Sequence, residues 1–181
     1  DMQYMFYKAA NFNQSLYDWD TSNVTNMQSM FFGATAFNGP LNPDGWDVSK
    51  VTNMKEMFYN AKNFNQELNA WNTSSLTDVY QMFYGATAFD QDLDGWDVSG
   101  IYDFSYFFEG ATNFNGNIST WTFPQDPFNY INMEGMFKGT ESFDGDLNSW
   151  DVSGVDNMKA MFWGSGFTGS AGLAWDTKNV Y

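Results

Sequence analysis

The chain has 181 residues and a net charge of −15, with seven Lys and no Arg. Nucleic-acid binding needs clustered cations, and an anionic membrane surface would repel this charge, so the composition argues against both partners. Aromatic residues make up 20% of the chain, which is incompatible with disorder. Cys and His are absent, which excludes disulfides and thiolate metal sites and removes the commonest general base. No apolar run is long enough to insert into a membrane.

A repeat of about 25 residues runs through the chain in seven copies. Each copy carries a Met-Phe or Phe-Phe pair and a second Phe, and six of the seven carry a Leu or Ile four residues after that Phe. Each copy also carries one of the tryptophans Trp19, Trp46, Trp71, Trp96, Trp121, Trp150 and Trp175. A period of this length is typical of a solenoid, in which each unit buries its apolar face against its neighbours. We therefore expect one repeat domain over residues 1–181, cut in mid-unit and part of a longer array.

Two elements are predicted in each unit. The segment "LNSWDV" from Leu147 resembles the leucine-rich-repeat strand, with Trp150 and Val152 inward and Asp151 outward. Met54, Met57, Phe58 and Ala61 follow helical spacing. Helix N-caps are expected at Asn26, Asn53, Asp78, Asp103, Asn132 and Asn157, and left-handed helix ends at Gly33, Asn60, Gly85, Gly110, Gly139 and Gly164. The expected fold is an α/β solenoid, leucine-rich-repeat-like, with a parallel β-sheet on one face and short helices on the other.

The repeated Trp is expected to fill the core, with a surface ladder that stacks on sugars as the alternative. Trp163 falls outside this ladder, on a predicted helix, and should be exposed. Two insertions interrupt the repeat, "NPDG" at Asn42–Gly45 and "FPQDPF" at Phe123–Phe128. Proline cannot donate a backbone hydrogen bond, so the second insertion should bulge from the sheet, either as a binding feature or as a tolerated surface loop.

The motifs "WDTSNVTNM", "MFFGATAFN" and "FNQELNAW" resemble the repeats of the BspA-like leucine-rich-repeat surface proteins. The resemblance covers almost the whole chain and is weakest at Pro124–Asn129 and Gly166–Ala174. It implies an extracellular, cell-surface protein without catalysis and without a shared ligand, so no catalytic or cofactor-binding residues are carried over.

Acidic residues form two columns along the predicted sheet. One follows the tryptophans and includes Asp97 and Asp151; the other lies before the strand and includes Asp92, Asp94 and Asp146. Like charges about 4.8 Å apart repel, and Ca²⁺ could neutralise them, so these five residues are the candidate calcium ligands. A solvated acidic face without metal is the alternative. A glycosidase pair would need a carboxylic acid in an apolar pocket, which a filled solenoid does not offer.

A further column consists of Asn13, Asn38, Asn65, Asp90, Asn115 and Asp144 and is expected to be a buried ladder that hydrogen-bonds to the backbone. Among the N-x-S/T sequons, Asn23, Asn72 and Asn117 could carry glycans in a secreting eukaryote, whereas ladder membership disfavours Asn13.

The two ends of the chain, "WDTKNVY" and "DMQYMF", join into one further repeat when they are read end to start. An uncapped solenoid face is expected to pair with other copies, or with more repeats of the same kind. The leading functional hypothesis is a non-catalytic extracellular module that binds a protein or glycan partner at a cell surface. The alternative is a structural subunit of an extracellular filament or sheath assembled end to end. An enzyme is the least favoured hypothesis.

Overall fold

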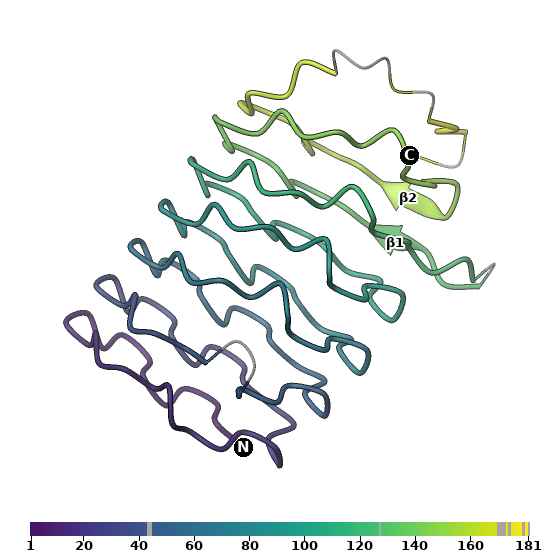
Figure 1. Cartoon of the computed structure of the whole chain (residues 1–181). Helices are drawn as coiled ribbons and strands as arrows, with labels where there is room; N and C mark the ends of the chain where they lie inside the picture. The colour runs from purple at the N-terminus through teal and green to yellow at the C-terminus, as the bar shows by residue number, and fades with distance from the viewer. Residues whose placement is uncertain (43–44, 127, 170–172, 174, 179, 181) are drawn as a thin grey trace.

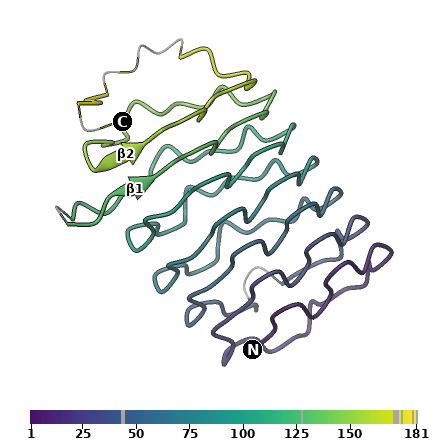
Figure 2. The ribbon, with the colours of Figure 1, turned by 180° about the vertical axis from the view of Figure 1, so that it is seen from behind.

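The computed structural model describes residues 1–42, 45–126, 128–169, 173, 175–178 and 180. The chain winds into stacked coils, and each repeat of about 25 residues makes one coil (Figure 1). The first coil lies at one end of the stack and the last at the other, and the view from behind shows the same order (Figure 2). Residues one repeat apart therefore lie side by side on neighbouring coils.

Backbone hydrogen bonds join the coils, but little of this pairing is regular sheet. β1 (Ile131–Asn132) and β2 (Val155–Asn157) are parallel strands that pair with each other. Isolated parallel bridges join the residue pairs Asn26–Asn53, Asn53–Asp78 and Asp103–Asn132. The predicted strand at Leu147–Val152 is therefore wrong, because this segment forms no strand. The pairing between coils lies instead at the positions predicted as helix N-caps, as one short pair of strands and a line of single bridges among the described residues.

The predicted helices are wrong, and with them the α/β solenoid, because the part of the chain that the structure describes contains no helix. The segment from Met54 to Ala61 is a run of overlapping turns. The Met57 amide donates to the Met54 carbonyl at 3.1 Å, whereas the next amide, of Phe58, donates to Met82 on the neighbouring coil at 2.9 Å. A helix would need every amide to bond four residues back along its own segment.

Positive φ angles explain why no helix forms. Each coil has two such residues, four positions apart, for example Glu56 at 54° and Asn60 at 52°. A residue in this left-handed region interrupts a right-handed helix. The predicted left-handed conformation at Gly33, Asn60, Gly85, Gly110, Gly139 and Gly164 is confirmed, but these residues end turns rather than helices.

The residues predicted as N-caps have a related role without a helix. The Oδ1 atom of Asn53 accepts a 2.9 Å hydrogen bond from the amide of Lys55, two residues later. The same turn occurs at Asn26, Asp78, Asp103, Asn132 and Asn157. These side chains satisfy a backbone donor locally, as an Asx turn does.

The predicted core is confirmed. Met54, Met57, Phe58 and Ala61 are fully buried, so the inward side chains of a run of turns follow the same spacing as a helix face. Trp71 and Trp96 are only 2% and 4% exposed. Aromatic rings stack from coil to coil, as Trp46 does on Trp71 with ring centroids 6.1 Å apart.

The Asn ladder joins successive coils. The Oδ1 atom of Asn38 accepts the amide of Asn65 at 2.9 Å, and that of Asn65 accepts the amide of Asp90 at 2.9 Å. The series runs from Asn13 to Asp144, whose Oδ1 accepts the amide of Thr168. The predicted backbone role is confirmed, although several members, including Asn13, are exposed rather than buried.

The two insertions differ in how much of each the structure describes. Residues 43 and 44 of the first, residue 127 of the second, and residues 170–172, 174, 179 and 181 near the end lie outside the described residues. In the second insertion Phe123 is buried and Phe128 is 87% exposed, and Tyr130, two residues beyond the insertion, is 61% exposed. The described residues on either side of residue 127 project beyond the neighbouring coils, as predicted (Figure 1).

Candidate partner-binding surface

The acidic column that follows the tryptophans is held by local hydrogen bonds. Asp97 Oδ1 accepts the Ser99 amide at 3.0 Å and the Ser99 hydroxyl at 2.6 Å, and Asp151 Oδ1 accepts the Ser153 amide at 3.0 Å. Hydrogen bonds from the serine hydroxyl and then from its backbone amide lower the pKa of both carboxyl groups. The negative charge of these carboxylates is therefore partly stabilised by hydrogen bonds from the chain itself.

The second acidic group is bonded differently. Asp92 accepts the Asn117 amide at 2.7 Å, Asp94 accepts the Asn69 side-chain amide at 2.9 Å, and Asp146 accepts the Asn148 amide at 2.9 Å. Within the described residues, no three acidic side chains come together in a group that could hold a metal ion. The five candidate calcium ligands thus lie on two separate columns, and calcium binding stays a prediction.

The three sequon asparagines, Asn23, Asn72 and Asn117, are exposed. Asn72 Oδ1 accepts hydrogen bonds from the amide and hydroxyl of Ser74, and the side-chain amide of Asn117 donates to Asp94 at 3.2 Å. Nothing in their packing blocks a glycan, and glycosylation stays a prediction.

A different surface carries a concentration of aromatic and basic side chains. It is formed by the outward side chains of residues 3–8, 28–33, 55–60, 80–85, 105–110, 134–139 and 159–164, and we call it the tyrosine–lysine face. Four of the seven lysines of the chain lie on it. Its tyrosines, lysines and tryptophan are Tyr4, Tyr7, Lys8, Lys55, Tyr59, Tyr80, Tyr84, Tyr106, Lys138, Lys159 and Trp163.

A column of stacked rings crosses this face. Tyr7 stacks on Phe32, Phe32 on Tyr59 and Tyr59 on Tyr84, with ring centroids 4.4–4.8 Å apart. Burial raises the pKa of Tyr59, and so does its hydrogen bond to Tyr84. Stacking covers the ring faces, so the column offers mainly ring edges and hydroxyl groups to a partner.

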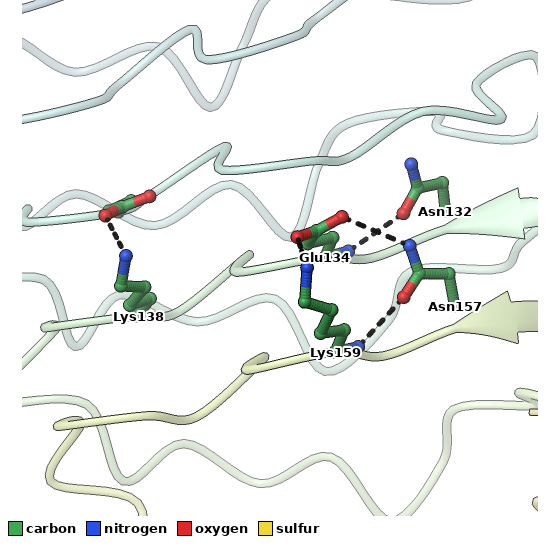
Figure 3. Close-up of polar contacts among 6 residues, drawn as sticks. Asn132, Glu134, Lys138, Asn157 and Lys159 are labelled. Carbon is green, nitrogen blue, oxygen red and sulfur yellow. Dashed lines mark hydrogen bonds and ion pairs between the residues drawn. The ribbon is translucent and has the colours of Figure 1, made fainter. Parts of the chain in front are cut away.

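Charged residues continue the column on the following coils. Lys138 Nζ lies 2.8 Å from Glu109 Oε1 (Figure 3). It also lies 5.4 Å from the ring centroid of Trp163. The Glu109 carboxylate raises the pKa of Lys138. Trp163 is 70% exposed, as predicted, although it lies in a turn rather than on a helix.

A second pair lies beside the first. Lys159 Nζ lies 3.0 Å from Glu134 Oε1, and the side-chain amide of Asn157 approaches the same carboxylate at 3.4 Å (Figure 3). Tyr106 donates a hydrogen bond to Glu134, which raises the pKa of Tyr106 to about 12. Opposite charges are thus paired here, whereas the Asp columns carry much of the negative charge elsewhere on the chain.

Sequence reasoning missed the tyrosine–lysine face because its positions vary from repeat to repeat. The column that begins with Tyr7 reads Tyr, Phe, Tyr, Tyr, Glu, Lys and Trp along the stack. One sequence pattern could have revealed this face: in five of the seven copies, an aromatic residue directly follows the Phe of the Met-Phe pair. The helix prediction considered only inward positions such as Met54, Met57 and Phe58, and gave the residue after this Phe no role as part of a column.

Comparison with curated proteins gives no match, and neither does comparison with solved structures. One family model matches three overlapping stretches, residues 1–95, 41–126 and 96–181, which together span the whole chain. No described segment forms a helix long and apolar enough to cross a membrane. The repeated matches agree with the repeat seen in the sequence and in the coils. The chain belongs to the family described as "Mycoplasma protein of unknown function, DUF285".

Proposed function

We propose that this chain is a non-catalytic, extracellular repeat module that binds a partner at a cell surface through its tyrosine–lysine face. The observation that carries the proposal is Trp163, which is 70% exposed beside the ion pair of Lys138 and Glu109. Large aromatic residues with a polar rim are enriched where proteins bind partners. The extracellular location rests on the resemblance of the repeated motifs to BspA-like surface proteins, which we retain as part of the proposal.

The test uses the labelled 181-residue chain and immobilised mucin, fibronectin, collagen and laminin. The wild-type chain should bind at least one of them, and Trp163→Ala should weaken that binding by about tenfold or more, the loss typical of an interface anchor. Tyr17→Ala is the matched control, because Tyr17 is 50% exposed but lies outside the tyrosine–lysine face. The proposal fails if the wild type binds none of the four, or if the two variants bind equally well.

A second function, assembly end to end, is favoured by the backbone of the two end coils. Between coils, amides such as those of Ser29 and Phe31 donate to carbonyls on the following coil. Among the described residues, the equivalent amides of Met158, Ala160, Phe162 and Gly164 have no acceptor, and the equivalent carbonyls of Gln3, Met5 and Tyr7 have no donor. One end thus offers donors at the spacing at which the other offers acceptors, so a coil of the same kind, from another copy or from further repeats of a longer chain, can continue the stack at either end.

Sedimentation of the chain over a range of concentrations tests this second function. Association should appear as concentration rises, and Met5→Lys should abolish it, because Met5 is 49% exposed on the first coil. Tyr130→Lys is the control, since Tyr130 lies on the projecting segment. A concentration-independent monomer would contradict the end-to-end proposal.

A further inference from the structure

The line of bridges between coils is interrupted at one place. Bridges or strand pairing join Asn26, Asn53 and Asp78 in one run, and Asp103, Asn132 and Asn157 in another. Within the described residues, no bridge joins Asp78 to Asp103. The amide of Val79 has no hydrogen bond to the Asp103 carbonyl, although the equivalent amide of Met54 bonds to Asp78 at 2.9 Å.

The interruption coincides with a change of residue type. The column has Asn at four of its six internal positions and Asp only at these two neighbouring ones. Asp78 Oδ1 accepts the amide of Tyr80 at 3.2 Å, and Asp103 Oδ1 accepts the amide of Ser105 at 2.9 Å. Neither Oδ2 atom has a hydrogen-bond partner among the described residues. Two carboxylate oxygens are therefore available at the gap.

A surface depression of about 400 Å³ lies over this gap, at the edge of the tyrosine–lysine face, to which its residues Lys55 and Tyr80 belong. It is lined by Lys55, Thr77, Asp78, Tyr80 and Asp103. The Lys55 ammonium lies 5.0 Å from the centroid of the Tyr80 ring. The volume of the depression falls within the range of small-molecule sites, about 300–1,000 Å³.

The chemistry of this lining favours a neutral ligand rich in hydroxyl groups. The carboxylates accept hydrogen bonds, the ammonium donates them, the Thr77 hydroxyl does either, and the Tyr80 ring supplies apolar surface. Hydrogen bonds to charged groups are the stronger ones. A metal ion would need further oxygen ligands, and the described residues offer no third acidic side chain here.

We infer that this depression binds one sugar unit of a neutral glycan, with Asp78 and Asp103 accepting its hydroxyl groups beside the ring of Tyr80. The inference rests on the proposed function and names its ligand class. A basic peptide is the competing occupant, but its cation would have to enter beside the Lys55 ammonium that already lies over Tyr80. Repulsion between these cations disfavours it, whereas a neutral sugar meets no such repulsion.

The test is binding of the whole chain to immobilised mucin from which sialic acid has been removed, before and after periodate oxidation of the vicinal diols of the remaining neutral sugars. The central variant is the double substitution Asp78→Asn and Asp103→Asn. Asn occupies the same position in the neighbouring coils, so this variant should fold with an unchanged or raised melting temperature. We expect it to bind mucin at least tenfold more weakly than the wild type, with the same loss for Tyr80→Ala and none for Tyr17→Ala.

Each outcome decides between the proposals. Binding that is abolished by periodate and weakened in the Asn variant supports the sugar site. Binding that survives periodate, or an Asn variant that binds like the wild type, overturns the sugar site but leaves partner binding in place. Binding that is removed by Trp163→Ala yet insensitive to periodate identifies a protein surface as the partner. If the wild type does not bind mucin, the sugar site is overturned. If it binds none of the four immobilised proteins, the proposed function is overturned as well.

Discussion

The indole Nε1 of Trp96 donates a 2.9 Å hydrogen bond to the backbone carbonyl of Leu68 on the preceding coil. The same bond forms at Trp46, Trp121, Trp150 and Trp175. Among the repeated tryptophans that have a preceding coil, Trp71 is the exception, because its buried Nε1 has no partner within the described part of the chain. The Leu41 carbonyl that would be equivalent to Leu68 directly precedes the insertion at Asn42–Gly45.

This difference predicts unequal effects of one substitution. Trp96→Phe loses the indole hydrogen bond to the Leu68 carbonyl, which keeps its 3.1 Å bond from the Trp71 amide, so it should lower the free energy of unfolding by about 0.5–1.5 kcal/mol more than Trp71→Phe. Trp71→Phe removes a buried donor that is already unsatisfied. Urea unfolding of the two variants measures the difference, and equal losses of stability would show that the indole bond contributes nothing.

Close approach between coils predicts a second contrast. A Cβ atom at Gly116 would lie 2.1 Å from the Gln91 carbonyl oxygen, whereas one at Gly154 would lie 3.3 Å from its nearest atom, the Pro124 oxygen. Gly116→Ala must push two coils apart, at a cost of about 1–3 kcal/mol or more. Gly154→Ala should change the melting temperature little. Equal melting temperatures for the two variants would contradict the close stacking of coils at Gln91.

The Asn ladder predicts a dependence on the side-chain oxygen. Asn65→Ala leaves the Asp90 amide without its acceptor and should cost about 1–2 kcal/mol in denaturant unfolding. Asn65→Asp keeps the oxygen, as Asp90 and Asp144 do at equivalent positions, and should cost much less. The exposed Asn63 lies outside the ladder, so Asn63→Ala serves as the control. If Asn65→Asp lowered the free energy of unfolding as much as Asn65→Ala, the side-chain oxygen would not have this role.

The acidic column predicts how stability depends on pH. Hydrogen bonds from the serine two residues later lower the pKa of Asp20, Asp47, Asp97 and Asp151 below the ordinary value of 3.8. The folded state therefore binds protons less readily than the unfolded state, so this stabilisation is present above that value and is lost as pH falls through the lowered pKa values. The melting temperature should stay constant as the pH is lowered from about 6 to about 4, and should decrease at lower pH. Asp97→Asn should flatten that fall, and an unaltered profile would contradict the assigned hydrogen bonds.

Burial could be predicted from the sequence more fully than backbone conformation. The spacing of Met54, Met57, Phe58 and Ala61 gave the correct inward face, because a run of turns and a helix present the same positions. It could not distinguish the two, since the difference lies in which carbonyl accepts the Phe58 amide. Positive φ at Glu56 had no signal in its residue type, whereas Asn60 and the equivalent glycines did. The site at Tyr80 depends on neighbours one repeat away, so the spacing within one repeat could not reveal it.

The central claim, that partners bind through the tyrosine–lysine face, can be tested by labelling lysines with an amine-reactive reagent in the free chain and in the chain bound to immobilised mucin. Lys55, Lys138 and Lys159 lie on this face, while Lys50 and Lys62 lie outside it. Mass spectrometry should find labelling of the first three reduced on binding and labelling of the other two unchanged. Protection of Lys50 and Lys62 with continued labelling of Lys55, Lys138 and Lys159 would contradict the account.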